Sequence, residues 1–229
     1  MKKPTVDYRQ LRLSKLTDPQ FSHLLLLLGW IGYLILFFLT ERLIPAERCA
    51  PVHCALDDLV PFCEFFLIPY VGWYLLIVGS LVYFLLYNVE NFKRLQTYFM
   101  IVQAIAIAIF ILFPTRQDLR PTEFPRDNFF TDGVAYLYSI DTNTGVCPSL
   151  HCALSIGIAS IWLKENSVGG GFKVFIVVNA TLVCLSTVFL KQHSAIDFFA
   201  ALPLCLIAEA ITCGSYWKTR FKPKAQQKA

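Results

Sequence analysis

The chain of 229 residues is far more apolar than a water-soluble protein of this length. Hydrophobic residues make up 56% of it and charged residues 16%, whereas soluble domains have about 45–50% and about 25%. The net charge of +4 is small, and the basic residues lie toward the ends of the chain, which argues against a nucleic-acid-binding protein. The composition predicts one integral membrane domain over 1–229, with the lipid bilayer as partner and no nucleic acid.

Long runs without charged residues predict the membrane-spanning helices. A helix needs about 20 apolar residues to cross the hydrocarbon core, and within lipid it satisfies its own backbone hydrogen bonds. A basic segment at about 1–23 precedes the helices and a basic tail at about 217–229 follows them. The helices are predicted at about 24–44, 65–88, 95–114, 148–164, 173–190 and 195–216. The expected fold is an all-α bundle of six transmembrane helices.

The distribution of lysine and arginine predicts the orientation of this bundle. With the N-terminus in the cytoplasm, the cytoplasmic segments are 1–23, about 88–97, about 164–173 and the tail. They carry 14 of the 20 basic residues. Because positive charge is retained on the cytoplasmic side, both termini are expected there. The compact chain and short basic tail favour a bacterial plasma membrane.

The first candidate site residues form two polar clusters, which both lie on the outer side in this topology. Arg116 and Arg120 are four residues apart just outside the third predicted helix, and their planar guanidinium groups suit phosphate oxygens. Pro148-Ser149-Leu150-His151 begins the fourth predicted helix. The free N–H groups at a helix start, with a serine hydroxyl beside them, can hold an anion.

A third cluster on the same side runs from Ser186 to Asp197. His193 and Asp197 are four residues apart and share one face if this stretch is helical. A carboxylate bonded to one imidazole nitrogen leaves the other nitrogen free as a base or nucleophile. Lys191 adds a cation nearby. Two histidines, a carboxylate and several cations at one interface indicate phosphoryl transfer.

These motifs resemble those of the type 2 phosphatidic acid phosphatase superfamily. That family carries a basic motif ending in Arg-Pro, then Pro-Ser-x-His, then Ser-Arg-x5-His-x3-Asp, on a six-helix bundle. Arg120-Pro121, Pro148 to His151 and Ser186 to Asp197 match in this order. Two positions differ: Phe113 stands where the family has lysine, and Thr187 where it has arginine. The Ser-Thr pair resembles the branch of inositol-phosphoceramide and sphingomyelin synthases.

The resemblance implies a lipid phosphatase that acts at the outer leaflet through a phosphohistidine intermediate. His193 is expected to attack phosphorus, Asp197 to orient its ring, and His151 to protonate the leaving oxygen. The residues expected to bind the substrate phosphate are Arg120, Ser149, Leu150, Arg116 and Lys191. No metal or cofactor is expected, since no cysteines and histidines have the spacing of a structural zinc site.

The expected substrate is a lipid mono- or diphosphate, such as phosphatidic acid or a polyprenyl diphosphate. Two alternatives stay open. One is a lipid headgroup phosphotransferase, in which an alcohol replaces water as acceptor. The other is a non-catalytic membrane protein, which the intact set of His151, His193 and Asp197 disfavours. The oligomeric state is left open.

Acidic residues outside the motifs have simpler expected roles. Glu209 interrupts the last predicted helix near its cytoplasmic end, and we expect it to pair with Lys218 or to reach the membrane interface. Asp57 and Asp58 lie in the first outer loop, where they either contact a substrate headgroup or are solvated.

Overall fold

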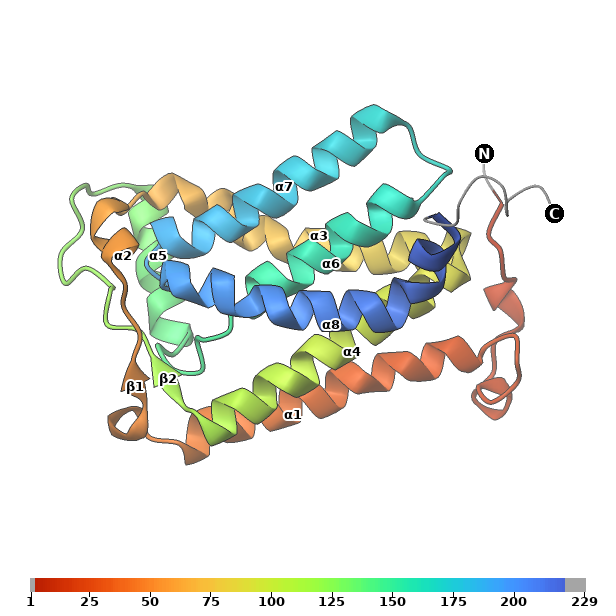
Figure 1. Ribbon diagram of the computed structural model, residues 1–229, viewed down its shortest axis with the longest axis horizontal. Coiled ribbons are helices and arrows are strands. Elements are labelled where there is room, and N and C mark those ends of the chain that lie inside the picture. The colour runs from red at the N-terminus through yellow and green to blue at the C-terminus, as the bar shows by residue number, and fades with distance from the viewer. Residues whose placement is uncertain (1–2, 221–229) are drawn as a thin grey trace.

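The computed structural model describes residues 3–220 as a bundle of long helices (Figure 1). Five helical segments are long and apolar enough to cross a membrane: Ser22–Leu43, Glu64–Tyr87, Val89–Leu112, Gly170–Phe189 and Ala195–Arg220. The sixth expected span is α6 (Leu150–Lys164), an apolar helix of 15 residues. The fold is therefore that of a mostly helical, multi-pass membrane protein. The final residues of the expected basic tail, 221–229, lie outside the described residues.

The five apolar segments contain the long helices, and the other elements are short. The long helices are α1 (Leu28–Leu43), α3 (Leu67–Tyr87), α4 (Val89–Leu112), α7 (Gly170–Phe189) and α8 (Ala195–Arg220). The short elements are α2 (Ala55–Leu59), α5 (Phe129–Ile140), and the parallel strands β1 (Ala50–Pro51) and β2 (Thr115–Arg116). Five 3-10 turns complete the described chain: Tyr8–Gln10, Leu13–Lys15, Ser22–Leu27, Ala46–Arg48 and Glu64–Phe66.

The start of α4 differs from the expected helix at 95–114. The side chain of Asn88 accepts a hydrogen bond from the backbone N–H of Asn91, which caps the helix and lets it begin at Val89. The charged residues Lys93 and Arg94 therefore lie inside the first turns of α4 rather than in a loop. A charge-free run predicts too short a helix when the first turns of that helix lie in the polar interface and carry charged residues.

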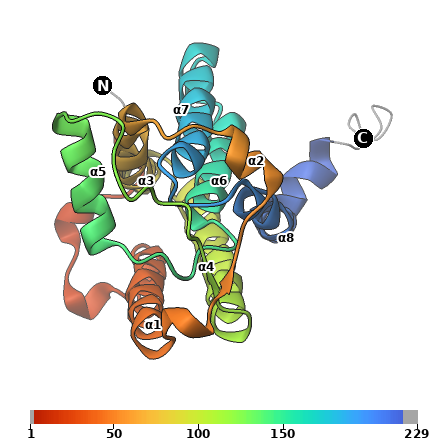
Figure 2. The same cartoon turned by 90° about the vertical axis from the view of Figure 1, so that its left-hand side faces the viewer.

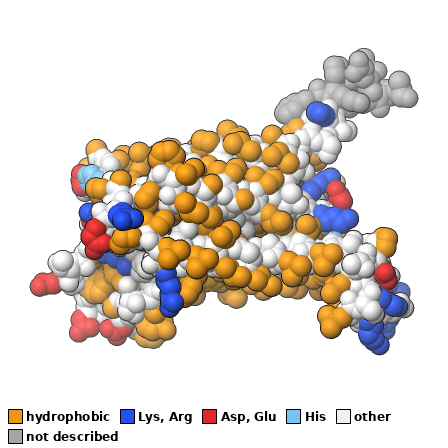
Figure 3. Space-filling view, turned by 90° about the horizontal axis from the view of Figure 1, so that it is seen from below, with side chains coloured by type: hydrophobic (Ala, Val, Ile, Leu, Met, Phe, Trp, Pro, Cys, Tyr) orange, Lys and Arg blue, Asp and Glu red, His pale blue; other side chains and the backbone are white. Residues whose placement is uncertain are grey.

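The two ends of the bundle differ in what covers them. The described N-terminal segment and the end of α8 lie at one end, whereas β1, β2, α2 and α5 lie at the other (Figures 1 and 2). On the face drawn in Figure 3, charged side chains gather at both ends, with a hydrophobic surface between them. This pattern is that of a protein whose middle lies in lipid. The three sequence clusters all fall at the end that carries α2 and α5.

The core is centred on α4, which packs against α6 and α8. Its residues Phe92, Tyr98 and Phe99 are fully buried. Gly157 of α6 lies directly against the ring of Tyr98, where a Cβ atom would overlap the aromatic carbons. The small residue lets the two helices approach closely, as is common in membrane bundles.

Glu209 pairs with Lys164 of α6, not with Lys218 as the sequence suggested. The Lys164 Nζ lies 2.7 Å from Glu209 Oε1, and the two side chains are only 5% and 19% exposed. Glu209 also accepts hydrogen bonds from Ser160 (2.8 Å) and Trp217 (2.6 Å). The pairing follows from the packing of α6 beside α8, because a buried lysine without a partner would be strongly destabilising.

We expect Gly157→Ala to lower the free energy of unfolding of the detergent-solubilised protein by about 1–3 kcal/mol, the usual effect of overpacking a core, and so to lower its melting temperature. The measurement is the melting temperature followed by intrinsic fluorescence. Gly79→Ala is the matched control, because nothing lies within 4 Å of the added Cβ there. Equal melting temperatures for Gly157→Ala and Gly79→Ala would contradict the close contact with Tyr98.

Candidate functional site

The segment between α7 and α8 reverses the chain and carries His193. Lys191 adopts a positive φ of 53°. After it, the backbone N–H groups of Gln192 and His193 both donate to the carbonyl of Thr187, at 2.9 and 3.0 Å. The Thr187 hydroxyl donates to the carbonyl of Cys184 at 2.8 Å, so this position, where the family has arginine, offers no cation. The turn holds His193 against the last turn of α7.

His193 is bonded to Asp197 as expected, but His193 precedes α8, so the two side chains meet across the start of the helix and do not share a helical face. The distance from His193 Nδ1 to Asp197 Oδ2 is 3.0 Å, and the backbone N–H of Ser194 donates to the same oxygen at 3.1 Å. An ionised carboxylate only accepts hydrogen bonds, so Nδ1 carries the proton and Nε2 is left available. Burial by itself lowers the pKa of His193, but the hydrogen bond to Asp197 and its charge outweigh burial, and the net shift is upward.

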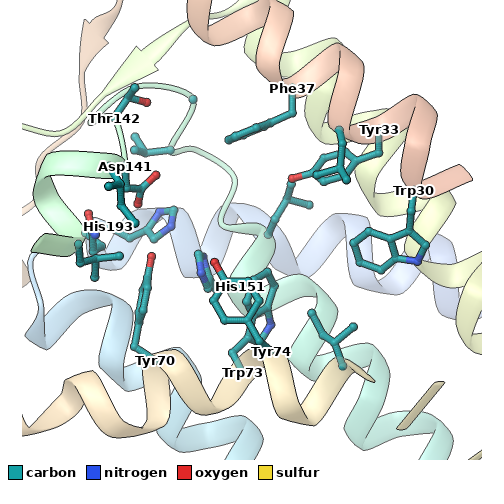
Figure 4. Close-up of a pocket in the computed structure, with 18 of the residues that line it drawn as sticks. Trp30, Tyr33, Phe37, Tyr70, Trp73, Tyr74, Asp141, Thr142, His151 and His193 are labelled. Atoms are coloured by element: carbon teal, nitrogen blue, oxygen red, sulfur yellow. The ribbon is translucent and has the colours of Figure 1, made fainter. Parts of the chain in front are cut away.

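His151 faces His193 across a shared space (Figure 4). The two ring centroids are 5.7 Å apart, and the His151 ring packs on Trp73 (4.2 Å) and Tyr70 (4.6 Å) of α3. Its Nε2 is buried and has no hydrogen-bond partner among the described residues. Buried polar atoms are usually paired, so this nitrogen is placed to meet a ligand.

The space between the histidines is one end of a cavity of about 560 Å³. Its length is walled by apolar and aromatic side chains of α1 and α3, including Trp30, Phe37 and Ile77. Its polar end is formed by Asp141, Gln192 and the two histidines. The volume lies within the range of about 300–1,000 Å³ that is typical of small-molecule sites. The cavity therefore joins a reactive end to a long hydrophobic one.

Three buried donors at this cavity lack partners. The Nε1 of Trp73 and the Nε2 of Gln192 resemble His151 Nε2 in having no hydrogen-bond partner among the described residues. All three residues line the cavity. Gln192 is oriented because its Oε1 accepts from Arg120 at 2.6 Å, which leaves its NH₂ group unpaired. Unpaired donors in a cavity wall are suited to the oxygens of a bound ligand.

Arg120 supports the site from behind and does not line the cavity. Its Nη1 donates to the carbonyl of Asp141 at 3.0 Å, and its Nη2 donates to the carbonyl of Thr142 at 2.8 Å and to Gln192. The guanidinium also lies 4.6 Å from the centre of the Tyr138 ring. Arg120 thus ties the end of α5 to the chain reversal that holds His193.

Arg116 is likewise occupied by neighbouring groups. Its Nε lies 3.0 Å from a carboxylate oxygen of Asp118, and its Nη1 donates to the carbonyls of Ala46 and Cys49 at 2.9 and 3.0 Å. It joins the loop before β1 to β2. The structure does not bring Arg116 into the cavity wall.

Lys191 anchors the chain reversal to the first loop. Its Nζ donates to the carbonyls of Asp57 and Val60, at 2.8 and 2.5 Å. The Asp57 carboxylate in turn accepts from Ser194 Oγ (2.5 Å) and from the backbone N–H of Ala195 (2.7 Å). Asp57 therefore caps α8 and is buried. It neither contacts the cavity nor remains solvated.

Ser149 and Leu150 begin α6 at the site. The Ser149 side chain caps the helix by accepting from Cys152 N–H at 3.4 Å, and its own N–H donates to the carbonyl of Asp197 at 3.1 Å. Ser149 is fully buried, whereas Leu150 lines the cavity. Of the five residues expected to bind phosphate, only Leu150 forms part of the cavity wall.

The structure adds Asp141, Gln192, Tyr70 and Trp73 to the residues expected from the sequence. Burial raises the pKa of Asp141, and the positive charges of Arg120 and His193 oppose that rise. Asp141 and Gln192 are close in sequence to the motifs. That closeness is the only sequence feature that points to them as site residues. The α3 aromatics lie far away in the sequence and carry no such signal.

We expect Asp197→Asn to lower the pKa of His193, because the charge that stabilises the imidazolium is lost while burial remains. The measurement is an NMR titration of ¹⁵N-histidine-labelled protein, in which only four histidines report. Asp58→Asn is the control, since Asp58 pairs with His53 at 2.9 Å. An unchanged His193 midpoint in Asp197→Asn would count against the pairing.

Comparison of the chain with protein-family models, curated proteins and solved structures found no match. The relation to the phosphatidic acid phosphatase superfamily therefore stays a prediction from three motifs. The structure places two of these motifs together, at His151 and at the His193–Asp197 pair, and holds the arginine of the third behind them.

Proposed function

We propose that this protein is a membrane enzyme that removes or transfers the phosphoryl group of a lipid phosphate, without a metal ion, through a phosphohistidine on His193. The observation that carries the proposal is the pair of opposed histidines. His193 has its Nδ1 fixed by Asp197, and the unpaired Nε2 of His151 lies across the cavity. The ring centroids are 5.7 Å apart, and a nucleophile and a general acid must both reach the group that reacts.

The first step forms the covalent intermediate. Nε2 of His193 attacks the terminal phosphorus, and the bond from that phosphorus to the leaving oxygen breaks. The leaving group is the lipid alcohol of a monophosphate or the lipid monophosphate of a diphosphate. Protonated His151 gives its proton to that leaving oxygen, and Asp197 stabilises the positive charge that develops on the His193 ring. The phosphate oxygens are proposed to accept from the unpaired NH₂ group of Gln192 and from the free N–H groups at the start of α6.

The second step releases the phosphoryl group. A water molecule loses its proton to His151 and attacks phosphorus while the bond from phosphorus to His193 breaks. Inorganic phosphate leaves, and both histidines return to their starting protonation states. The main proposal is therefore a lipid phosphatase, which hydrolyses a phosphatidic acid-like or polyprenyl lipid phosphate.

A headgroup phosphotransferase is the second candidate, and the enclosure of the site favours it. His193 is only 8% exposed, and the walls beside the histidines are aromatic. Such a site limits water, whereas a lipid alcohol can enter along the apolar cavity. In that case the acceptor hydroxyl loses its proton to His151 and takes the place of water in the second step.

The hydrophobic length of the cavity supports a lipid as substrate. Its apolar walls follow α1 and α3 from the histidines toward Leu27, which precedes α1 at the far end. We place the histidine end at the outer face of a bacterial plasma membrane and both termini in the cytoplasm. The support is the basic residues at the opposite end, such as Lys93, Lys173 and Lys218, and the positive-inside rule.

Replacing His193 by alanine is expected to reduce turnover of lipid mono- and diphosphates by a factor of about 10³ or more, as loss of a nucleophile does. Purified protein is assayed with excess chelator, with and without an acceptor lipid, for both free phosphate and lipid products. His53→Ala is the control, because His53 is exposed and pairs with Asp58. Acid-labile phosphate mapped to His193 by mass spectrometry identifies the intermediate.

The products separate the two candidates in the same experiment. Free phosphate from wild type alone supports hydrolysis, and a phosphorylated acceptor lipid without free phosphate supports transfer. Activity that is equal in wild type and His193→Ala, or lost on chelation, would refute the proposed mechanism.

Val78→Trp tests whether a lipid chain occupies the cavity. Val78 of α3 lines it and is 58% exposed toward lipid. We expect KM for long-chain substrates to rise about fivefold. The tryptophan would prevent about one methylene group from being buried, which costs ~1 kcal/mol of binding free energy. Short-chain soluble substrates keep their KM. Val82→Trp, one turn along α3 and outside the cavity wall, is the control, and an equal effect of both variants would rule out this placement.

A further inference from the structure

Helix α5 lies across the long helices, at the end of the bundle that carries the candidate site. It extends from the side of α3 toward α1 (Figures 1 and 2). At its start, Asn128 caps the helix and donates to Glu64, just before α3, at 3.0 Å. Beyond its end, the hydroxyl of Thr142 donates to Glu41 of α1 at 2.5 Å. The helix is therefore fixed at both ends and bridges α3 and α1 where the bundle meets its loops.

One side of α5 packs on the protein and sets how the helix is turned about its axis. With about 100° between successive residues, Thr131, Val134 and Tyr138 share this side. Val134 is fully buried with Tyr70 and Leu190. The Tyr138 hydroxyl donates to the carbonyl of Leu190 at 2.6 Å. The other sides of the helix are thereby assigned to fixed directions.

The two sides that flank this contact differ in polarity. One of them, which we call the polar stripe, consists of the exposed residues Asp132, Ala135 and Ser139. The opposite side carries Phe130 and Leu137, which are partly buried. The Phe130 ring lies 5.2 Å from that of Phe65, before α3, and Leu137 lines the cavity. A polar side opposite an apolar side gives α5 the orientation of a helix at a boundary between water and hydrocarbon.

The side of α5 that points away from the protein is apolar. This outward stripe consists of Phe129, Tyr136 and Ile140, which are 81%, 68% and 64% exposed. The three positions lie within about 40° of one another around the helix. An apolar stripe beside a polar one is the pattern of a helix that lies in the membrane interface. A tyrosine suits that depth, because its ring is apolar and its hydroxyl can reach water.

The outward stripe is continuous with surfaces of the bundle that face lipid. The Phe129 ring lies 5.7 Å from that of Phe130, which in turn contacts the exposed Phe65 beside α3. At the other end of the stripe, Ile140 lines the cavity between α1 and α3. Lipid that covers the exposed sides of these two helices can therefore extend onto the stripe without a polar gap.

We propose that α5 is an interfacial helix that docks on the lipid leaflet at this end of the bundle, with the outward stripe in contact with lipid and the polar stripe facing water. Its apolar side then lies about 5–10 Å into the boundary between headgroups and acyl chains. Because Ile140 also lines the cavity, lipids on the stripe lie at the rim of the cavity. The inference goes beyond the proposed function and requires no catalytic step.

Spin labelling in vesicles of phosphatidylcholine and phosphatidylglycerol tests this placement. The label is a nitroxide joined to p-acetylphenylalanine, whose ketone reacts without involving the eight native cysteines. It replaces Phe129 or Tyr136 in the outward stripe, and Asp132 or Ser139 in the polar stripe as matched controls. Electron paramagnetic resonance then measures collisions with O₂, which concentrates in hydrocarbon, and with a nickel chelate, which stays in water.

Two further labels calibrate the measurement. Leu75 is exposed on α3, and Asp58 is exposed on α2. We expect labels in the outward stripe to collide more often with O₂ than with nickel, as the label at Leu75 does. Labels in the polar stripe should collide more often with nickel, as the label at Asp58 does. All the labelled positions are exposed, and a melting temperature equal to that of wild type verifies the fold of each protein.

Other patterns overturn the inference. If one reagent dominates at all four labelled positions of α5, the helix lies wholly in water or wholly in hydrocarbon, and its stripes do not mark the interface. Low collision rates with both reagents at Phe129 and Tyr136 show instead that protein, such as a second copy of this chain, covers the outward stripe. The proposed function is judged separately by the turnover of His193→Ala, so either can fail while the other stands.

Discussion

The hydrogen bond between His193 and Asp197 is the interaction on which the site depends, and it exists because α8 begins where it does. Asp57 accepts from the backbone N–H of Ala195, and Asp197 accepts from that of Ser194. Two carboxylates thus satisfy donors that the start of a helix leaves open. The carboxylate that caps the start of α8 also holds the ring of His193, which lines the cavity. Formation of this helix therefore orients the proposed nucleophile.

The cations near the site stabilise loops through their bonds to backbone carbonyls. Arg116, Arg120 and Lys191 each donate to two or more carbonyl oxygens. Loops packed against a bundle bury carbonyls that no helix or sheet satisfies, and such groups need donors. A sequence shows that a cation is present but not which acceptors surround it. For this reason the expected phosphate-binding arginines and lysine could be placed near the site but not in it.

The sequence predicts well what depends on local composition. Charge-free runs predict the long helices. The short spacing of His193 and Asp197 predicts their pair, although His193 precedes α8 and the pair does not lie on a helical face. It predicts poorly what depends on packing between distant segments. The start of α4 at Val89 needs a capping side chain, and the Lys164–Glu209 pair needs α6 beside α8. Asp141 belongs to the site only because Arg120 holds the end of α5 there.

The proposed chemistry has to work with neutral donors, and this explains the shape of the site. In the proposed reaction, charge that develops on the phosphate oxygens is met by N–H groups of Gln192 and of the first turn of α6, with a protonated histidine as the mobile charge. Such donors are effective only where water does not compete with them. The aromatic rings that pack on His151 exclude water, and they also form the start of the apolar cavity. One wall therefore serves both the reaction at phosphorus and the binding of a hydrocarbon chain, so an enzyme of this design acts on substrates that bring such a chain with them.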